Sequence, residues 1–214
     1  MPLVVIGLTG RAGSGKSTVA ARLLALYGGE RRPFALPLKR LLRLFLEDQG
    51  VASALAHRMT DGDLKEVPSD HLGGATPRRA MQTLGTEWGR CLSASLWVDA
   101  WRRSAEELRR RVSAAGETIL LVADDVRFPN EVEAIRALGG LVVRIDRPGT
   151  GLAGTDGSHA SETCDLGPAD GVIVNDDDLA RLFEAVDALA RSAMDRDVAP
   201  LFVTAAAAPC ARRS

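Results

Sequence analysis

The sequence predicts an α/β fold in which a parallel sheet of about five strands is flanked by helices. Two short apolar runs, Leu3–Leu8 and Thr118–Ala123, are typical of strands that are buried on both faces. Stretches with apolar residues at helical spacing alternate with such runs, which favours right-handed crossovers between parallel strands. With 214 residues, of which 46% are hydrophobic, the chain is long enough to bury one sizeable core.

The N-terminal part of the chain predicts two strands and two helices. The first strand, Leu3–Leu8, is followed by a helix that is expected over Ser17–Tyr27 and ended by the pair Gly28–Gly29. A second short strand is expected over Pro33–Leu36. The next helix is expected from Leu38 to about Asp48, because its leucines recur every three to four residues.

In the middle of the chain, residues 52–76 have weak periodicity and several Pro and Gly residues, so a loop-rich region is expected. Pro77 suits the first position of a helix that continues towards Leu92. A longer amphipathic helix with a charged face is expected over Leu96–Ala115. The second buried strand, Thr118–Ala123, follows it.

The last third predicts the remaining elements of the sheet and its cover. A helix is expected over Asn130–Leu138, strands over Leu141–Ile145 and Gly171–Val174, and a final helix over Asp177–Met194. Residues 148–168 are rich in Gly, Thr, Ser and Asp without periodicity. A long loop of this kind in a compact domain is usually functional or mobile.

Composition and charge argue against several classes of protein. Lys and Arg total 27 against 28 Asp and Glu, so the net charge of −1 provides no field to hold a nucleic acid or an anionic membrane. The cysteines Cys91, Cys164 and Cys210 lack the spacing of a zinc site or a disulfide framework. No stretch reaches the about 18 apolar residues of a membrane span. We expect a soluble, cytoplasmic protein without nucleic-acid or membrane partners.

The strongest motif is a glycine-rich loop between the first predicted strand and helix. Residues 10–17, GRAGSGKS, match GxxxxGK[ST], whose backbone N–H groups surround a triphosphate at the positive end of a helix. Lys16 is expected to contact the β- and γ-phosphates, Ser17 to coordinate Mg²⁺ and Thr18 to contact the α-phosphate. The predicted ATP-binding residues of this loop are Gly10, Arg11, Ala12, Gly13, Ser14, Gly15, Lys16, Ser17 and Thr18.

GTPases, ATP-driven transporters and small-molecule kinases all share this loop. A GTPase needs an Asn-Lys-x-Asp segment late in the chain, yet the last of the three lysines is Lys65. A transporter subunit needs a Leu-Ser-Gly-Gly signature, which the sequence lacks. A small-molecule kinase is therefore the favoured class.

A kinase with a phosphorylated acceptor must neutralise two polyanions, so arginines outside the phosphate loop are expected. Arg78 and Gln82 lie four residues apart on one helical face, and Gln82 could pair with a base edge. A solvated basic helix start is the alternative. Trp88 could stack on a base, although its helical spacing is also that of a core residue.

The segment Asp124–Glu131 directly follows the second buried strand. In open parallel sheets the carboxyl ends of strands line the ligand crevice. Asp125 could therefore hold a Mg²⁺-bound water or orient the acceptor, and Arg127 could bridge the acceptor phosphate and the transferred group. A helix N-cap with an incidental ion pair is the alternative.

Together these motifs resemble the deoxynucleoside monophosphate kinases of bacteriophages, which are relatives of the adenylate kinase-like P-loop kinases. The resemblance covers most of residues 3–190. It rests on GRAGSGKST at 10–18, PLKRLL at 37–42, TPRRAMQTLGTEWGR at 76–90, DVRFPNE at 125–131, RIDRP at 144–148, HASE at 159–162 and VND at 174–176.

The resemblance implies that the γ-phosphate of ATP is transferred, with Mg²⁺, to a deoxynucleoside 5′-monophosphate. It places Arg127 over the transferring phosphate and Asn175 near the adenine. With Lys16 of the phosphate loop and Asp125 at the strand end, Arg127 completes the predicted catalytic residues. A lid loop would carry the residues His159, Ser161 and Glu162. The substrate-binding residues that it implies, with Trp88 and Glu131 from the same segments, are Lys39, Arg78, Arg79, Gln82, Trp88, Arg90 and Glu131.

The sequence also divides the chain by role, although its longer loop at 149–158 and its C-terminal tail depart from the family pattern. We expect one P-loop nucleoside monophosphate kinase-like domain over residues 1–196, with a helical acceptor-binding insertion at about 37–115 and a lid loop at about 147–168. Residues 197–214 would form a flexible C-terminal tail. A homodimer is left open, and if a phage encodes the protein, the host cytoplasm is its location.

Two alternatives stay open from the sequence. The first is a P-loop kinase for another small acceptor such as dephospho-coenzyme A, which the late strand and the VND segment also resemble. The second is a non-catalytic module in which nucleotide binding switches a partner surface.

Overall fold

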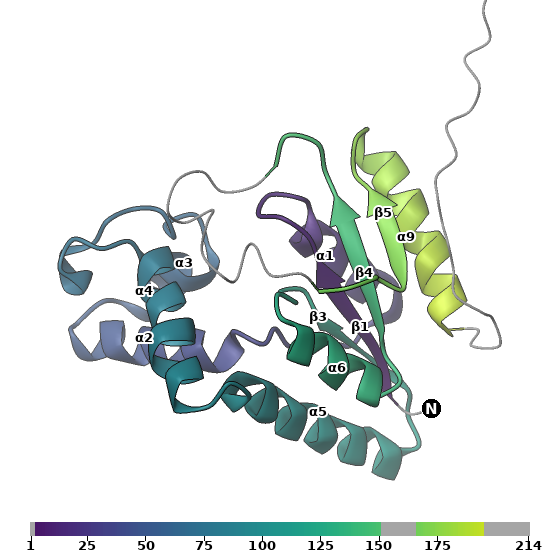
Figure 1. Cartoon of the computed structure of the whole chain (residues 1–214), viewed down its shortest axis with the longest axis horizontal. Coiled ribbons are helices and arrows are strands. Elements are labelled where there is room, and N and C mark those ends of the chain that lie inside the picture. The colour runs from purple at the N-terminus through teal and green to yellow at the C-terminus, as the bar shows by residue number, and fades with distance from the viewer. Residues whose placement is uncertain (1–2, 151–165, 195–214) are drawn as a thin grey trace, which may run out of the picture.

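The computed structural model describes residues 3–150 and 166–194 (Figure 1). Its centre is a five-stranded, fully parallel sheet with the strand order β2-β3-β1-β4-β5. This arrangement confirms the α/β fold that the sequence predicts. The strands are β1 (Leu3–Thr9), β2 (Glu30–Arg31), β3 (Ile119–Ala123), β4 (Leu141–Asp146) and β5 (Gly171–Val174).

The helices fall into two groups, as Figure 1 shows. Those that cover the sheet are α1 (Lys16–Tyr27), α5 (Leu96–Ala115), α6 (Pro129–Ala137) and α9 (Leu179–Met194). The others project to one side as a helical lobe, which consists of α2 (Leu36–Asp48), α3 (Ser53–Asp61), the 3₁₀ turn η1 (Asp70–Leu72), α4 (Pro77–Thr83) and the π-helix η2 (Leu84–Arg90).

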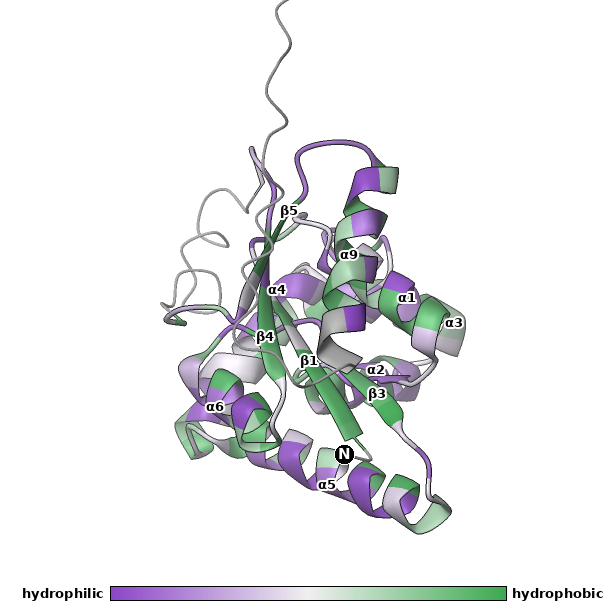
Figure 2. Ribbon diagram, turned by 90° about the vertical axis from the view of Figure 1, so that its right-hand side faces the viewer, coloured by the Kyte–Doolittle hydropathy of each residue, from purple (hydrophilic) through white to green (hydrophobic). Residues whose placement is uncertain are grey.

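The central strand β1 explains why helices cover both faces of the sheet. All of its residues are buried, and successive side chains point to opposite faces. Val4, Ile6 and Leu8 pack against α1 and α9, whereas Leu3 and Val5 pack against α5 and α6. Figure 2 shows the resulting layers, with apolar strands between the two pairs of helices.

The helical lobe has a small core of its own. Leu42 and Leu46 of α2 pack with Val51, with Ala56 and Met59 of α3, and with partly buried residues of α4. The lobe is therefore held by apolar packing that is separate from the two clusters on the sheet. This independence keeps a crevice between the lobe and the sheet.

The prediction of a strand over Pro33–Leu36 is wrong. The second strand is β2 at Glu30–Arg31, and α2 begins at Leu36. Pro33 has no N–H to donate to a sheet ladder, and the N–H groups of Phe34 and Ala35 donate to the carboxylate of Asp125 at 2.8 and 2.9 Å. A side chain thus takes the place of a neighbouring strand.

The region between residues 52 and 76 contains more structure than its sequence predicts, because α3 forms at Ser53–Asp61. The next helix starts at Pro77 as expected, and the Thr76 hydroxyl accepts a hydrogen bond from the Arg79 N–H at 3.2 Å. Beyond Thr83 it continues as the π-helix η2. There the Gly85 carbonyl accepts a hydrogen bond from the Trp97 indole at 2.7 Å.

Most of the predicted lid loop, with His159, Ser161 and Glu162, and the predicted tail at 197–214 lie outside the described residues. Within the described ranges, residues 3–150 and 166–194, no helix is long and apolar enough to cross a bilayer.

The lobe core generates a stability prediction. Replacing Leu46, which is fully buried, with Ala is expected to lower the free energy of unfolding by about 2–5 kcal/mol. The matched control Leu44→Ala lies on the same helix and is 63% exposed, so a change within about 0.5 kcal/mol is expected. Urea unfolding of both variants tests this, and equal losses would contradict a lobe that is held by its own core.

Candidate functional site

The phosphate loop lies between β1 and α1, as predicted, and has the backbone that its glycines allow. Gly10, Gly13 and Gly15 have φ angles of 137°, 78° and 103°, which side chains rarely adopt. A Cβ atom at Gly10 would clash with the carbonyl oxygen of Ile145. The loop therefore curves tightly against the end of β4.

Asn175, which follows β5, braces this loop. Its Nδ2 donates a hydrogen bond to the Ser14 carbonyl at 2.9 Å, and a Cβ at Gly15 would lie only 2.6 Å from the same Nδ2. The hydroxyl of Ser14 is buried and has no hydrogen-bond partner among the described residues. A cradle with an unsatisfied buried hydroxyl fits a phosphate ligand.

Lys16 places its ammonium over the loop. Nζ donates to the carbonyls of Gly10 at 2.6 Å and Arg11 at 2.7 Å. Burial and the nearby Arg127 lower the pKa of Lys16 to about 8, although Asp124 and Asp125 oppose this shift. A bound anion would favour the charged form of this side chain.

Asp124 is a site residue that the motifs did not single out. It is 4% exposed, and its Oδ2 lies 3.4 Å from the hydroxyl of Ser17. Arg31 of β2 holds both carboxylate oxygens, with N–O distances of 2.9 and 2.7 Å. A phosphate-loop hydroxyl beside an aspartate is the arrangement with which P-loop proteins hold Mg²⁺.

Asp125 points the other way and has a different set of contacts. Its two oxygens accept the N–H groups of Phe34 and Ala35, so it joins the end of β3 to the start of α2. Burial, with a smaller contribution from Asp124, raises its pKa, while Lys39 opposes the shift. Successive residues of an extended chain point to opposite sides, so only one of the two carboxylates reaches Ser17.

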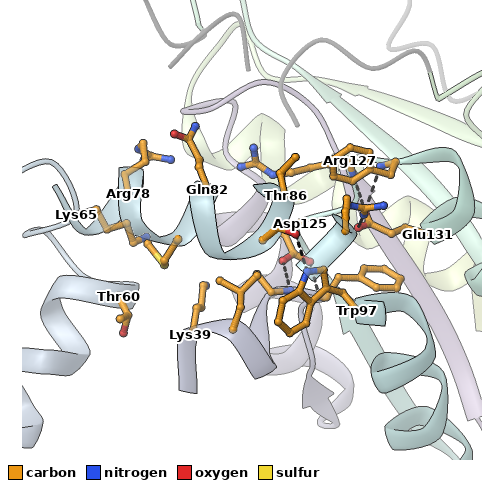
Figure 3. Close-up of a pocket in the computed structure, with 17 residues that line it drawn as sticks. Lys39, Thr60, Lys65, Arg78, Gln82, Thr86, Trp97, Asp125, Arg127 and Glu131 are labelled. Carbon is orange, nitrogen blue, oxygen red and sulfur yellow. Dashed lines mark hydrogen bonds and ion pairs between the residues drawn. The ribbon is translucent and has the colours of Figure 1, made fainter. Parts of the chain in front are cut away.

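A pocket lies between the helical lobe and the carboxyl end of β3 (Figure 3). It brings together seven of the predicted site residues, namely Lys39, Arg78, Gln82, Arg90, Asp125, Arg127 and Glu131. The motifs did not single out its other lining residues, which are Phe34, Ala35, Leu38, Thr60, Lys65, Met81, Gly85, Thr86, Trp97 and Phe128. We call this space the acceptor pocket.

Glu131 organises one wall of the acceptor pocket. Its Oε1 accepts from Arg90 Nη2 at 2.9 Å, and its Oε2 accepts from the N–H groups of Arg127 and Phe128 at 2.7 and 3.1 Å. The Arg90 guanidinium lies 3.5 Å from the centre of the Phe128 ring. Glu131 therefore caps the start of α6, as the alternative reading of this segment expects, and also positions Arg90.

Arg127 connects the acceptor pocket with the phosphate loop. It lines the pocket, and the N–H of the preceding residue, Val126, donates to the carbonyl of Leu8, two residues before the phosphate loop, at 3.1 Å. The charge of Arg127 also lowers the pKa of Lys16. Burial lowers the pKa of Arg127, and Asp125 is the largest opposing charge. A group between two anion sites is suited to stabilise charge that passes from one to the other.

Gln82 presents a free amide to the acceptor pocket. Both Oε1 and Nε2 are buried and have no hydrogen-bond partner among the described residues. A buried amide without partners is costly unless a ligand satisfies it. An amide offers one donor face and one acceptor face, as the edge of a base does.

The structure does not bring Arg79 and Trp88 to the acceptor pocket. Arg79 is exposed and lies 3.6 Å from Glu87, because adjacent residues of a helix point about 100° apart and its neighbour Arg78 faces the pocket. Trp88 is 47% exposed and packs at a tilt against Trp97, with ring centres 6.0 Å apart.

The environment of Glu131 generates a prediction about pH. Burial, followed by Asp125, raises the pKa of Glu131 to about 7. The folded state then holds this proton more tightly than the unfolded state, so the free energy of unfolding falls as the pH rises through about 7. From pH 5.5 to 8.5 this group is expected to contribute a loss of about 2 kcal/mol.

Urea unfolding at both pH values, with Glu131→Gln beside the unsubstituted protein, measures this contribution. The variant is expected to lack the loss, because its amide does not titrate. An identical pH dependence in both proteins would show that Glu131 is ionised throughout.

The chain is similar to several known proteins. The alignment with the crystal structure of TT1252 from Thermus thermophilus covers 88% of this chain and 97% of that one, at 20% identity and with a TM-score of 0.47. A protein of Acanthamoeba polyphaga mimivirus, whose name refers to a deoxynucleotide monophosphate kinase, is 33% identical over 170 residues, which are 75% of this chain and 81% of that relative. Residues 45–186 match the family model of deoxynucleotide monophosphate kinase. By these last two matches, the chain belongs to the deoxynucleotide monophosphate kinase family.

Proposed function

We propose that this protein transfers the γ-phosphate of ATP to the 5′-phosphate of a deoxynucleoside monophosphate, which yields ADP and a deoxynucleoside diphosphate. The observation that carries the proposal is the adjacency of two anion sites. The phosphate loop and the cation-lined acceptor pocket meet at Arg127, at the end of β3. The family match supports the same reaction.

The phosphate loop would bind ATP. Its glycines and the N-terminus of α1 would surround the triphosphate, and Lys16 would leave the loop carbonyls for the β- and γ-phosphates. Ser17 and Asp124 would hold Mg²⁺, which supplies charge neutralisation to the transferring group. Asn175 would keep the loop in shape through its bond to Ser14.

The acceptor pocket would bind the monophosphate and place its oxygen in line with the γ-phosphate. Lys39, Arg78 and Arg90 would provide positive charge for its phosphate, and Arg127 would lie over the group in transfer. The Gln82 amide would pair with the base. Asp125 would act indirectly, because its bonds to Phe34 and Ala35 fix the pocket wall next to Arg127.

The family match favours a deoxynucleotide over dephospho-coenzyme A as the acceptor, and an enzyme over a non-catalytic switch. A cytoplasmic location belongs to the proposal, because the cysteine pattern and the substrates both suit that compartment.

The proposal predicts acceptor-dependent release of ADP. A coupled assay would follow ADP from Mg·ATP with each of the four dNMPs, the four NMPs and dephospho-coenzyme A. At least one dNMP is expected to accelerate the release, and Lys16→Ala is expected to lower the rate by at least about 100-fold because it removes charge stabilisation at the phosphates. If only dephospho-coenzyme A accelerates the release, the protein is a kinase for that acceptor. If nucleotide binds but no acceptor accelerates the release, a non-catalytic nucleotide-binding switch is favoured.

A second prediction separates the two aspartates. Asp124→Asn is expected to lower kcat by about 100-fold or more and to raise the Mg²⁺ concentration needed for half-maximal activity, because a charged partner of Ser17 is lost. Binding of the dNMP alone, measured by calorimetry, should remain within about twofold, since Asp124 lies outside the acceptor pocket. A variant with unchanged Mg²⁺ dependence would remove Asp124 from the metal site.

A further inference from the structure

Lys65, in the loop between α3 and η1, is a half-buried cation whose ammonium has no ion pair or hydrogen bond among the described residues, although it lines the acceptor pocket. Its backbone is held in place, because its carbonyl accepts the N–H of Arg78 at 2.9 Å. A half-buried charge at the wall of a pocket, with no carboxylate in contact with it, is costly unless a ligand neutralises it.

Two further cations surround Lys65, and each of these has its own carboxylate. Lys39 donates to Asp61 at 2.6 Å, and Arg78 pairs with Glu66. Neither Asp61 nor Glu66 lines the acceptor pocket, whereas all three cations do. Figure 3 shows Lys65 next to Arg78 on the lobe wall, with Lys39 on the neighbouring helix. We call Lys39, Lys65 and Arg78 the lobe cations.

The lobe cations repel one another. Burial lowers the pKa of Lys65, and the charges of Lys39, Arg78 and Arg31 lower it further, while Asp61 opposes them. These charged groups come from four different elements, namely α2, α4, β2 and α3. The fold thus holds like charges together at a cost, which a bound anion would remove.

We propose that Lys65 binds the 5′-phosphate of the acceptor and is the residue through which the lobe cations distinguish a nucleotide from an uncharged nucleoside. This inference rests on the proposed function. A phosphate monoester carries about two negative charges near neutral pH and accepts several charge-assisted hydrogen bonds. A base is neutral and would leave the three charges facing one another.

The test compares three variants in the ADP-release assay with the best dNMP acceptor. Lys65→Met removes the charge and keeps the length of the side chain, Lys65→Arg keeps the charge, and Arg40→Met is the matched control. Arg40 is an exposed cation on α2 of the same lobe and does not line the pocket. Urea unfolding of each variant reports whether the fold is retained.

Lys65→Met is expected to raise the KM of the acceptor by about 10- to 100-fold, which is the loss of one charged hydrogen bond. The KM of ATP should remain close to that of the unsubstituted protein. The free energy of unfolding should be unchanged or slightly higher, because the variant relieves the repulsion among the lobe cations. Lys65→Arg should restore most of the acceptor affinity, and Arg40→Met should change nothing.

Calorimetry with inorganic phosphate and with the uncharged deoxynucleoside identifies the group that Lys65 contacts. Lys65→Met should weaken phosphate binding and leave nucleoside binding unchanged. If Lys65→Met weakens the binding of the nucleoside, or the binding of only one of the four dNMPs, Lys65 contacts the base and the inference is overturned. If acceptor KM is unaffected in an active protein, the inference fails while the kinase function stands; if the unsubstituted protein shows no acceptor-dependent turnover, the proposed function itself fails.

The pH dependence gives a signature that a structural role would not. Lysine loses its proton as the pH rises through its pKa, so acceptor KM should rise at alkaline pH in the unsubstituted protein. Lys65→Arg should flatten this rise, because a guanidinium keeps its charge. An unchanged alkaline profile in Lys65→Arg would show that another group titrates.

Discussion

Two adjacent carboxylates at the carboxyl end of β3 connect the parts of this molecule. Asp124 faces the phosphate loop, and both of its carboxylate oxygens accept hydrogen bonds from Arg31. Asp125 faces the helical lobe and accepts two backbone N–H groups just before α2. Because neighbouring residues of an extended chain point to opposite sides, one dipeptide reaches two sites.

The acceptor pocket gathers more positive charge than it neutralises. Glu131 and Asp125 lie on the side of β3 and α6, whereas the lobe cations have their carboxylates outside the pocket. Such an arrangement lowers the stability of the empty protein and favours a polyanionic ligand. The apolar core of the helical lobe is separate from the two clusters on the sheet.

The fold could be predicted well from the sequence, because buried parallel strands and their covering helices leave clear apolar patterns. Seven predicted site residues meet in one pocket for the same reason, since their motifs follow strand ends or lie on one helical face. Two departures depend on tertiary contacts that periodicity does not reveal. The chain at Pro33–Leu36 is held by the bonds from Phe34 and Ala35 to Asp125, and α3 packs into the lobe core through Ala56 and Met59. Arg79 was predicted to bind the substrate from its motif alone, but on α4 its side chain points away from the pocket. Asp124 shares the strand-end position of Asp125, but the sequence does not show which of the two carboxylates faces the phosphate loop, and Lys65 has no local signal beyond its residue type.

In the proposed reaction, the γ-phosphoryl group passes directly from ATP in the phosphate loop to a dNMP in the acceptor pocket. The most direct measurement follows the label from [γ-³²P]ATP in a single turnover with an excess of the preferred dNMP, with products separated by chromatography. The account predicts that the label appears in the deoxynucleoside diphosphate, with little inorganic phosphate. Label found only in inorganic phosphate would contradict it, because the pocket beside Arg127 would then not position an acceptor.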